Sequence, residues 1–211
     1  MTITQHIELG PWEIIEDRPF TDPAYSLEDL NRLQYILGRL QQLLSQPELL
    51  PAHPRPLVMY WPEPNERRLR LVFSQPEVLL ANQDLVVVGF CGQTAPKADR
   101  VLLEIVDGEL LAEFSEHPHL LCYCSLELEG GDWCNLVLFD QLQGIGHWTR
   151  SGRHGYAAIQ LAPQFYRSIR LHNALLPGGL MAGQSLSLLR TKYFDYQGGA
   201  IWWAVRELPT G

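Results

Sequence analysis

The chain has 211 residues, of which 46% are hydrophobic and 19% are charged, and its formal net charge is −8. This composition indicates a folded protein of one large domain, or a smaller domain with an extension, and excludes a largely disordered chain. Acidic residues outnumber basic residues both before and after residue 84, so there is no concentrated positive patch and we expect no nucleic-acid partner.

The first predicted element is a helix over residues 27–45. Ser26 and Asp29 form an N-cap pattern, and the leucines and isoleucines that follow are spaced three and four apart. Several prolines from residue 47 onward cannot continue a helix and predict an extended connection.

A hairpin should follow the helix, with strands at residues 57–61 and 69–73 joined by a turn. One helix and one hairpin are too little for an independent core. We therefore expect residues 1–83 to form an N-terminal extension that packs on a domain covering residues 84–211.

The second part opens with residues 84–91, a continuous β-branched run that is typical of a buried strand. Residues 97–116 fit two interpretations. Asp107 and Gly108 can form the turn of a hairpin, whereas the spacing of the apolar residues around them fits a helix, which we favour. Another hairpin is predicted over residues 120–129 and 133–139.

Apolar spacing becomes helical again over residues 141–162, but several glycines weaken this helix, and Ser151 can cap a second short helix after a break. An extended segment at residues 165–172 follows. The chain ends in a hairpin of residues 185–196 and 200–207, which is rich in aromatic side chains.

The order of elements over residues 84–173 is strand, helix, hairpin, broken helix and strand, which is the βαββαβ order of ferredoxin-like domains. We therefore predict an α+β fold with a ferredoxin-like core, an N-terminal helix-and-hairpin extension and a C-terminal β-hairpin.

The four cysteines all fall in strand-like runs, and their spacing matches no zinc pattern. The N-terminal segment does not resemble a secretory signal, and the longest apolar run is too short to cross a bilayer. We expect a cytoplasmic protein with no membrane span, no metal and no disulfide.

The stretch NLVLFDQLQGIGHWTRSGRHGYAA, residues 135–158, resembles the dimeric α/β-barrel proteins of the antibiotic biosynthesis monooxygenase type. In that group, a strand ending in an aromatic and an acidic residue leads to a helix with His or Trp, then Ser, then a further His or aromatic residue. The resemblance covers residues 84–173. It implies a homodimer whose two sheets join into a barrel, with a pocket between each sheet and its own helices.

Several members of this group oxygenate aromatic substrates without a metal, and some degrade heme. Heme-degrading members would be expected to carry a ligand histidine about ten residues after the helix tryptophan, and Ala158 stands there in this chain. We therefore expect no cofactor.

The candidate ligand-binding residues are His147, Trp148, His154, Arg170 and His172. On one regular helix, His147 and His154 would lie opposite an apolar stripe and face solvent. A break at Ser151 can turn His154 towards a pocket. Trp148 belongs to the apolar stripe, which is made of Leu142, Ile145, Trp148, Tyr156 and Ile159.

Arg170 and His172 alternate with apolar residues in the strand at 165–172, so they share one face of it. If that face looks into the pocket, the two side chains can hold an anionic group of a ligand.

These patterns indicate a protein that binds a small apolar or aromatic molecule, and the resemblance extends this to cofactor-free oxygenation. The sequence does not fix a reaction. The alternative is a non-catalytic assembly or regulatory protein that binds a protein partner through aromatic side chains of the C-terminal hairpin. Those side chains can equally cover the mouth of the barrel.

Overall fold

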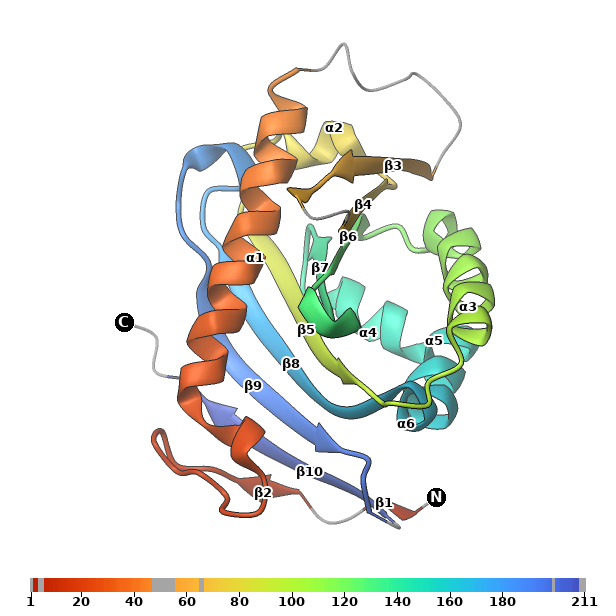
Figure 1. Ribbon diagram of the computed structural model, residues 1–211. Helices are drawn as coiled ribbons and strands as arrows, with labels where there is room; N and C mark the ends of the chain where they lie inside the picture. Colours follow the sequence, from red (N-terminus) through yellow and green to blue (C-terminus); the bar gives the residue numbers. More distant parts are fainter. Residues whose placement is uncertain (1, 4–5, 47–55, 65–66, 199, 209–211) are drawn as a thin grey trace.

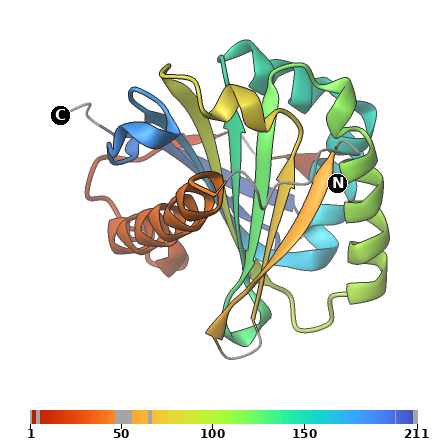
Figure 2. The same ribbon diagram turned by 90° about the horizontal axis from the view of Figure 1, so that it is seen from above.

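The computed structural model describes residues 2–3, 6–46, 56–64, 67–198 and 200–208. Within these residues, ten strands form one sheet with helices on both faces (Figures 1 and 2). Helix α1 crosses one face of the sheet, and helices α3 to α6 lie on the other face. The fold is therefore a mixed α/β arrangement around one central sheet.

Helix α1, Pro23–Leu44, begins earlier than the sequence predicts. Its N-cap is Asp22, whose carboxylate accepts a hydrogen bond of 2.8 Å from the backbone N–H of Ala24. Pro23 suits the first turn because it has no N–H that would need a partner. Ser26, the predicted cap, is instead a buried residue inside the helix.

The apolar stripe of α1 packs on the sheet to form the main core, as its spacing predicts. The α1 residues of this core are Leu33, Ile36, Leu37, Leu40, Leu43 and Leu44. Gly89 in the sheet allows the helix to come close, because a Cβ at this position would lie only 2.5 Å from Cδ1 of Leu33. One face of the sheet is therefore covered by the chain's own N-terminal helix.

Four antiparallel strands form the centre of the sheet in the order β8-β5-β7-β6. They are β5 Leu85–Thr94, β6 Leu120–Glu127, β7 Trp133–Phe139 and β8 Tyr166–Leu176. Each contains or overlaps a strand predicted from the sequence, so these predictions are confirmed.

Two hairpins extend this sheet on its two sides. Strands β3 Leu57–Pro62 and β4 Arg68–Phe73 pair with each other, and β4 also pairs with β6. Strands β9 Ser187–Asp195 and β10 Ala200–Glu207 form the C-terminal hairpin, and β9 pairs with β8. Both hairpins were predicted.

Three short elements were not predicted. Strands β1 Thr2–Ile3 and β2 Ile7–Glu8 pair with β10 in parallel, and α2, Pro76–Leu79, is a single helical turn. Elements of two to four residues are too short to show an alternating or helical apolar pattern.

The segment around Asp107 and Gly108 is helix α3, Arg100–Ala112, so the favoured interpretation is confirmed over the hairpin. The carboxylate of Asp99 caps it by accepting hydrogen bonds from the backbone N–H groups of Val101 and Leu102. This cap supplies the start signal that a hairpin lacks.

The predicted broken helix consists of α4 Gln143–Arg150, α5 Gly152–Tyr156, a π-helical turn Ala157–Leu161 and α6 Ala162–Phe165. Ser151 has extended backbone angles, and its hydroxyl accepts a 3.0 Å hydrogen bond from the backbone N–H of His154. The predicted break and cap at Ser151 are confirmed.

The predicted proline-rich connection over residues 47–55, part of the turn after β3 and Gly199 of the last turn lie outside the described residues. Among the residues that are described, no helix combines the length and the apolar character needed to cross a membrane. All four cysteines are buried in strands, as their positions predict.

Candidate functional site

A cavity of about 590 Å³ lies between the sheet and helices α3 to α6. Its floor comes from strands β5 to β10, and its roof comes from α3, α4, α5 and the π-helical turn. Apolar and aromatic side chains form most of the lining. The volume falls within the range of pockets that hold small molecules.

The π-helical turn supplies much of the roof, because four of its five residues line the cavity. Such turns are rare and occur often at functional sites. Ile159 lines the cavity and is also 50% exposed, so the cavity opens to solvent beside this turn.

The apolar stripe predicted for residues 142–159 is only partly found in the structure. Ile145 and Trp148 pack on the sheet, but Leu142 and Tyr156 are exposed. Tyr156 lies beyond Ser151, where the helix restarts, so it no longer keeps the angular position it would have on one continuous helix. Leu142 lies at the N-cap of α4 and is outside its apolar stripe.

His154 lies at the wall of the cavity. Its ring lies against that of Trp148, with centroids 4.9 Å apart, and its Nδ1 is buried with no hydrogen-bond partner in the described part of the chain. Burial lowers the pKa of His154 to about 4, with a smaller contribution from His117. The imidazole is therefore neutral at pH 7, with hydrogen-bonding capacity that no described side chain uses.

Trp148 and His147 leave helix α4 in different directions. Trp148 is 8% exposed, packs edge-on against Phe114 at 5.2 Å between ring centroids and also lines the cavity. His147 is exposed and lies 5.8 Å from the ring of His119, outside the set of residues that line the cavity. Of this pair, only Trp148 joins His154 at the cavity.

Polar side chains are few in the lining, and the sequence did not single out the most informative one. The Oδ1 of Asn135 accepts a 2.8 Å hydrogen bond from the hydroxyl of Ser125, which leaves its amide N–H groups without a partner among the described residues. Burial raises the pKa of Tyr166 well above its usual value, so this phenol stays protonated. Both groups can donate hydrogen bonds to a ligand.

The C-terminal hairpin contributes an aromatic wall. The ring of Phe194 lies nearly parallel to those of Tyr196 and Trp203, at interplanar angles of 9° and 7°, and all three residues line the cavity. Tyr193 is buried, and Trp202 packs edge-on against Phe20. Tyr193 is the one fully buried member of these five hairpin aromatics, and the other four are half-buried.

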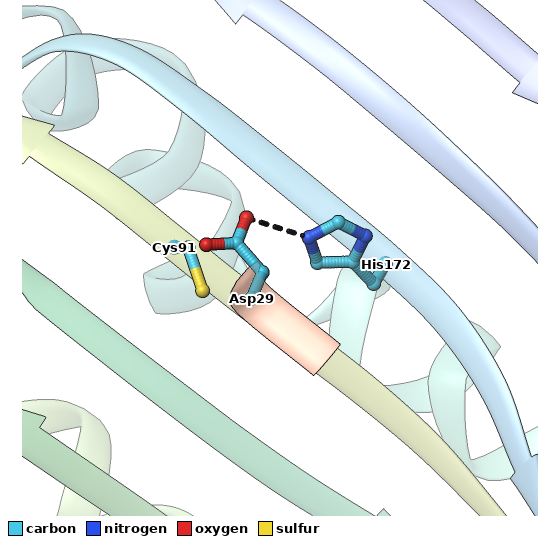
Figure 3. Close-up of side chains that lie close together, drawn as sticks. All are labelled: Asp29, Cys91 and His172. Atoms are coloured by element: carbon cyan, nitrogen blue, oxygen red, sulfur yellow. Dashed lines mark hydrogen bonds and ion pairs between the residues drawn. The ribbon is translucent and has the colours of Figure 1, made fainter. Parts of the chain in front are cut away.

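Arg170 and His172 lie on the opposite face of the sheet, beneath α1. Nε and Nη2 of Arg170 donate hydrogen bonds of 2.5 and 2.9 Å to the carboxylate of Asp29. Nε2 of His172 lies 3.0 Å from Oδ2 of Asp29, and its Nδ1 lies 2.9 Å from the hydroxyl of Thr191. Figure 3 shows Asp29 with Cys91 and His172 around it.

Burial and hydrogen bonds between oppositely charged groups explain the shifted pKa values of Asp29 and His172. Burial alone would raise the pKa of Asp29, but hydrogen bonds from His172 and Arg170 outweigh it and lower that pKa strongly. Burial alone would lower the pKa of His172, but the hydrogen bond to Asp29 outweighs it and raises that pKa. The anionic group that Arg170 and His172 hold is therefore a carboxylate of the same chain, and they do not share the cavity with His154.

Ligand atoms of Asp29, Cys91 and His172 lie within 4.8 Å of one another, which is close enough to be considered for a metal ion. Both oxygens of Asp29 already accept hydrogen bonds from Arg170, and the guanidinium would repel a cation. Burial also raises the pKa of Cys91, which keeps the thiol protonated. This cluster fits an internal ion pair, not a metal site.

Comparisons with known protein families and with curated proteins found no match. Among solved structures, the chain is similar to a protein from Shewanella oneidensis, with a TM-score of 0.39 and 10% identity, over 45% of this chain and 92% of that chain. It is also similar to a monooxygenase-like protein from Listeria innocua, with a TM-score of 0.31 and 12% identity, over 65% of this chain and 85% of that chain. Likenesses at this level assign neither a family nor a function.

Proposed function

We propose that this protein binds a small apolar or aromatic molecule in the cavity between the sheet and helices α3 to α6. One observation carries the proposal: a large apolar cavity has at its wall a neutral imidazole, that of His154, whose side chain has no hydrogen-bond partner among the described residues. Such a pairing of an apolar pocket with a perturbed titratable group is typical of binding and active sites.

We further propose that residues 84–173 form a ferredoxin-like core, within a domain of residues 84–211 on which residues 1–83 pack. The element order β5, α3, β6, β7, α4 to α6 and β8 supports it, as does the strand order β8-β5-β7-β6. In this core the cavity lies between the sheet and the core's own helices, α3 to α6.

A homodimer remains a prediction, but its interface cannot be the one that the resemblance implies. In the barrel that the resemblance implies, two chains join through the sheet face that lies away from helices α3 to α6. Helix α1 covers that face here with its apolar stripe. A homodimer of this chain would therefore have to use another surface.

Metal-free oxygenation is a second, dependent proposal. It begins at the hydroxyl of a reduced aromatic substrate, and the unpaired Nδ1 of His154 at the cavity wall can accept a hydrogen bond from that hydroxyl. With a pKa of about 4, the ring is too weak a base to hold the proton itself at pH 7, so its role would be to orient the substrate. An oxygen electrode with 1,4-naphthohydroquinone tests it. Oxygen uptake lost in His154→Gln supports turnover, whereas equal uptake in both proteins would mean that His154 has no part in it.

The binding proposal is tested by titration with the neutral fluorophore N-phenyl-1-naphthylamine. Ala157 lines the cavity, so Ala157→Trp should fill part of it and weaken binding by about tenfold or more, which corresponds to about 1.4 kcal/mol. Ala112→Trp is the matched control, because Ala112 is an exposed helix residue outside the lining. Equal binding by the two variants, or no binding by the wild-type protein, would contradict the proposal.

A further inference from the structure

Lys192 is an unpaired positive charge on the floor of the cavity. It is half-buried on β9, and its ammonium group has no hydrogen-bond or ion-pair partner among the described residues. The nearby carboxylate of Glu207 accepts a 2.6 Å hydrogen bond from Arg190 instead. Burial, with a further contribution from Arg190, lowers the pKa of Lys192 and outweighs the attraction of Glu207, which would raise it.

The other charged side chain in the lining is neutralised inside the protein. Asp107 of α3 forms two hydrogen bonds with the guanidinium of Arg70. With His154 neutral at pH 7, the described lining therefore has one unpaired charge, and this charge is positive. A half-buried cation gains most from a ligand that supplies the missing negative charge.

Strand pairing places Lys192 at one end of a row that runs across the cavity floor. Leu171 is its partner on β8, Phe90 follows on β5, and Asn135 follows on β7. Residues directly opposite one another on paired strands point to the same face, and all four line the cavity. Three strand spacings of about 4.8 Å put roughly 14 Å between the two ends of the row.

We propose that the ligand of this cavity is an elongated apolar or aromatic carboxylate, whose acid group pairs with Lys192 and whose body lies over Leu171 and Phe90. A single ammonium neutralises one negative charge, so a monoanion fits this site better than a dianionic phosphate. The inference rests on the proposed function and deepens it by naming the chemical class of the ligand.

The test uses two probes with the same apolar body, 1-pyrenebutyrate and 1-pyrenebutanol. Trp148 and Trp203 line the cavity, so quenching of tryptophan fluorescence reports binding of either probe. A charge-assisted hydrogen bond should make the wild-type protein bind the carboxylate about tenfold more tightly than the alcohol, or more. Lys192→Gln should abolish this preference, with a melting curve to confirm that the variant folds.

Two controls fix the location of the charge. Arg153 lies on α5 next to His154, but it is paired with Glu113 and is outside the lining, so Arg153→Gln should keep the preference for the carboxylate. Asn135 lines the far end of the row, so Asn135→Leu should also keep the preference, even where it changes the affinity for both probes.

The outcomes separate this inference from the binding proposal. If the wild-type protein binds both probes equally, or if Lys192→Gln keeps the preference, the carboxylate inference is overturned and the cavity remains a binding site. If the wild-type protein binds neither probe and also fails to bind N-phenyl-1-naphthylamine, the binding proposal fails and this inference fails with it.

Discussion

The carboxylate of Asp29 and the guanidinium of Arg170 form a two-point contact in the core, with hydrogen bonds of 2.5 and 2.9 Å. Asp29 belongs to α1 and Arg170 to β8, so this ion pair joins the N-terminal helix to the centre of the sheet. Both side chains are almost completely buried. The helix that covers this face is therefore held by a specific polar contact as well as by its leucine stripe.

Removing one charge of this pair should be strongly destabilising. Asp29→Asn leaves the guanidinium of Arg170 buried without an anion, and we expect the free energy of unfolding to fall by about 3–5 kcal/mol. Glu28→Gln is the matched control, because Glu28 lies beside Asp29 on the exposed side of α1, and its loss should cost about 0.5 kcal/mol or less. Urea unfolding measures both. A loss below about 1 kcal/mol in Asp29→Asn would show that the pair does not anchor the helix.

The same cluster predicts a pH dependence with two limits. The folded-state pKa of Asp29 is lowered from 3.8, so its stabilisation is present above that pH and is lost as pH falls further. The folded-state pKa of His172 is raised from 6.5, so its stabilisation is present below that pH and is lost as pH rises through the raised value. The difference in unfolding free energy between the wild-type protein and Asp29→Asn should therefore be largest between pH 3.8 and 6.5. A difference that does not change with pH would contradict this assignment.

The pKa of His154 should be shifted in the opposite direction from that of His172. Its buried ring favours the neutral form, so NMR of the labelled histidines should show one imidazole with a pKa of about 4. His154→Asn identifies that resonance by its loss. Because the folded-state pKa lies below the ordinary value of 6.5, His154 should make the protein less stable as pH falls from 6.5 towards 4. An ordinary pKa for this ring would mean that it faces solvent.

Gly89, where α1 packs closely on the sheet, should tolerate a side chain poorly, and Gly108 on α3 serves as the comparison. Gly89→Ala would place a Cβ 2.5 Å from Leu33, which is fully buried, so we expect a loss of about 1–3 kcal/mol. Gly108→Ala lies in open space on α3 and should stabilise the protein by about 0.5–1 kcal/mol. Thermal or urea unfolding of both variants checks this. Equal effects of the two substitutions would indicate that α1 does not pack closely at Gly89.

Regular patterns in the sequence predicted most of the fold. The stripe of α1, the hairpins and the cap at Ser151 are local features, and each is found in the structure. The short strands β1 and β2 could not be predicted, because their pairing with β10 depends on contacts with the far end of the chain.

The candidate site was predicted only in part. The alternation of β8 placed Arg170 and His172 together on one face, but the partner that decides which way this face points is Asp29, 141 residues before Arg170 in the chain. The break at Ser151 indicated that His154 can turn inward, and the structure has His154 at the cavity wall. Lys192 and Asn135 carry no local motif, and only the pairing of distant strands brings them to one cavity floor.

A crystal structure of the protein grown with saturating N-phenyl-1-naphthylamine tests the binding proposal most directly. The proposal predicts ligand density between the sheet and helices α3 to α6, in contact with Trp148 and beside His154. Density for the fluorophore only on the outer surface or beneath α1, with the cavity closed by its own side chains, would contradict it.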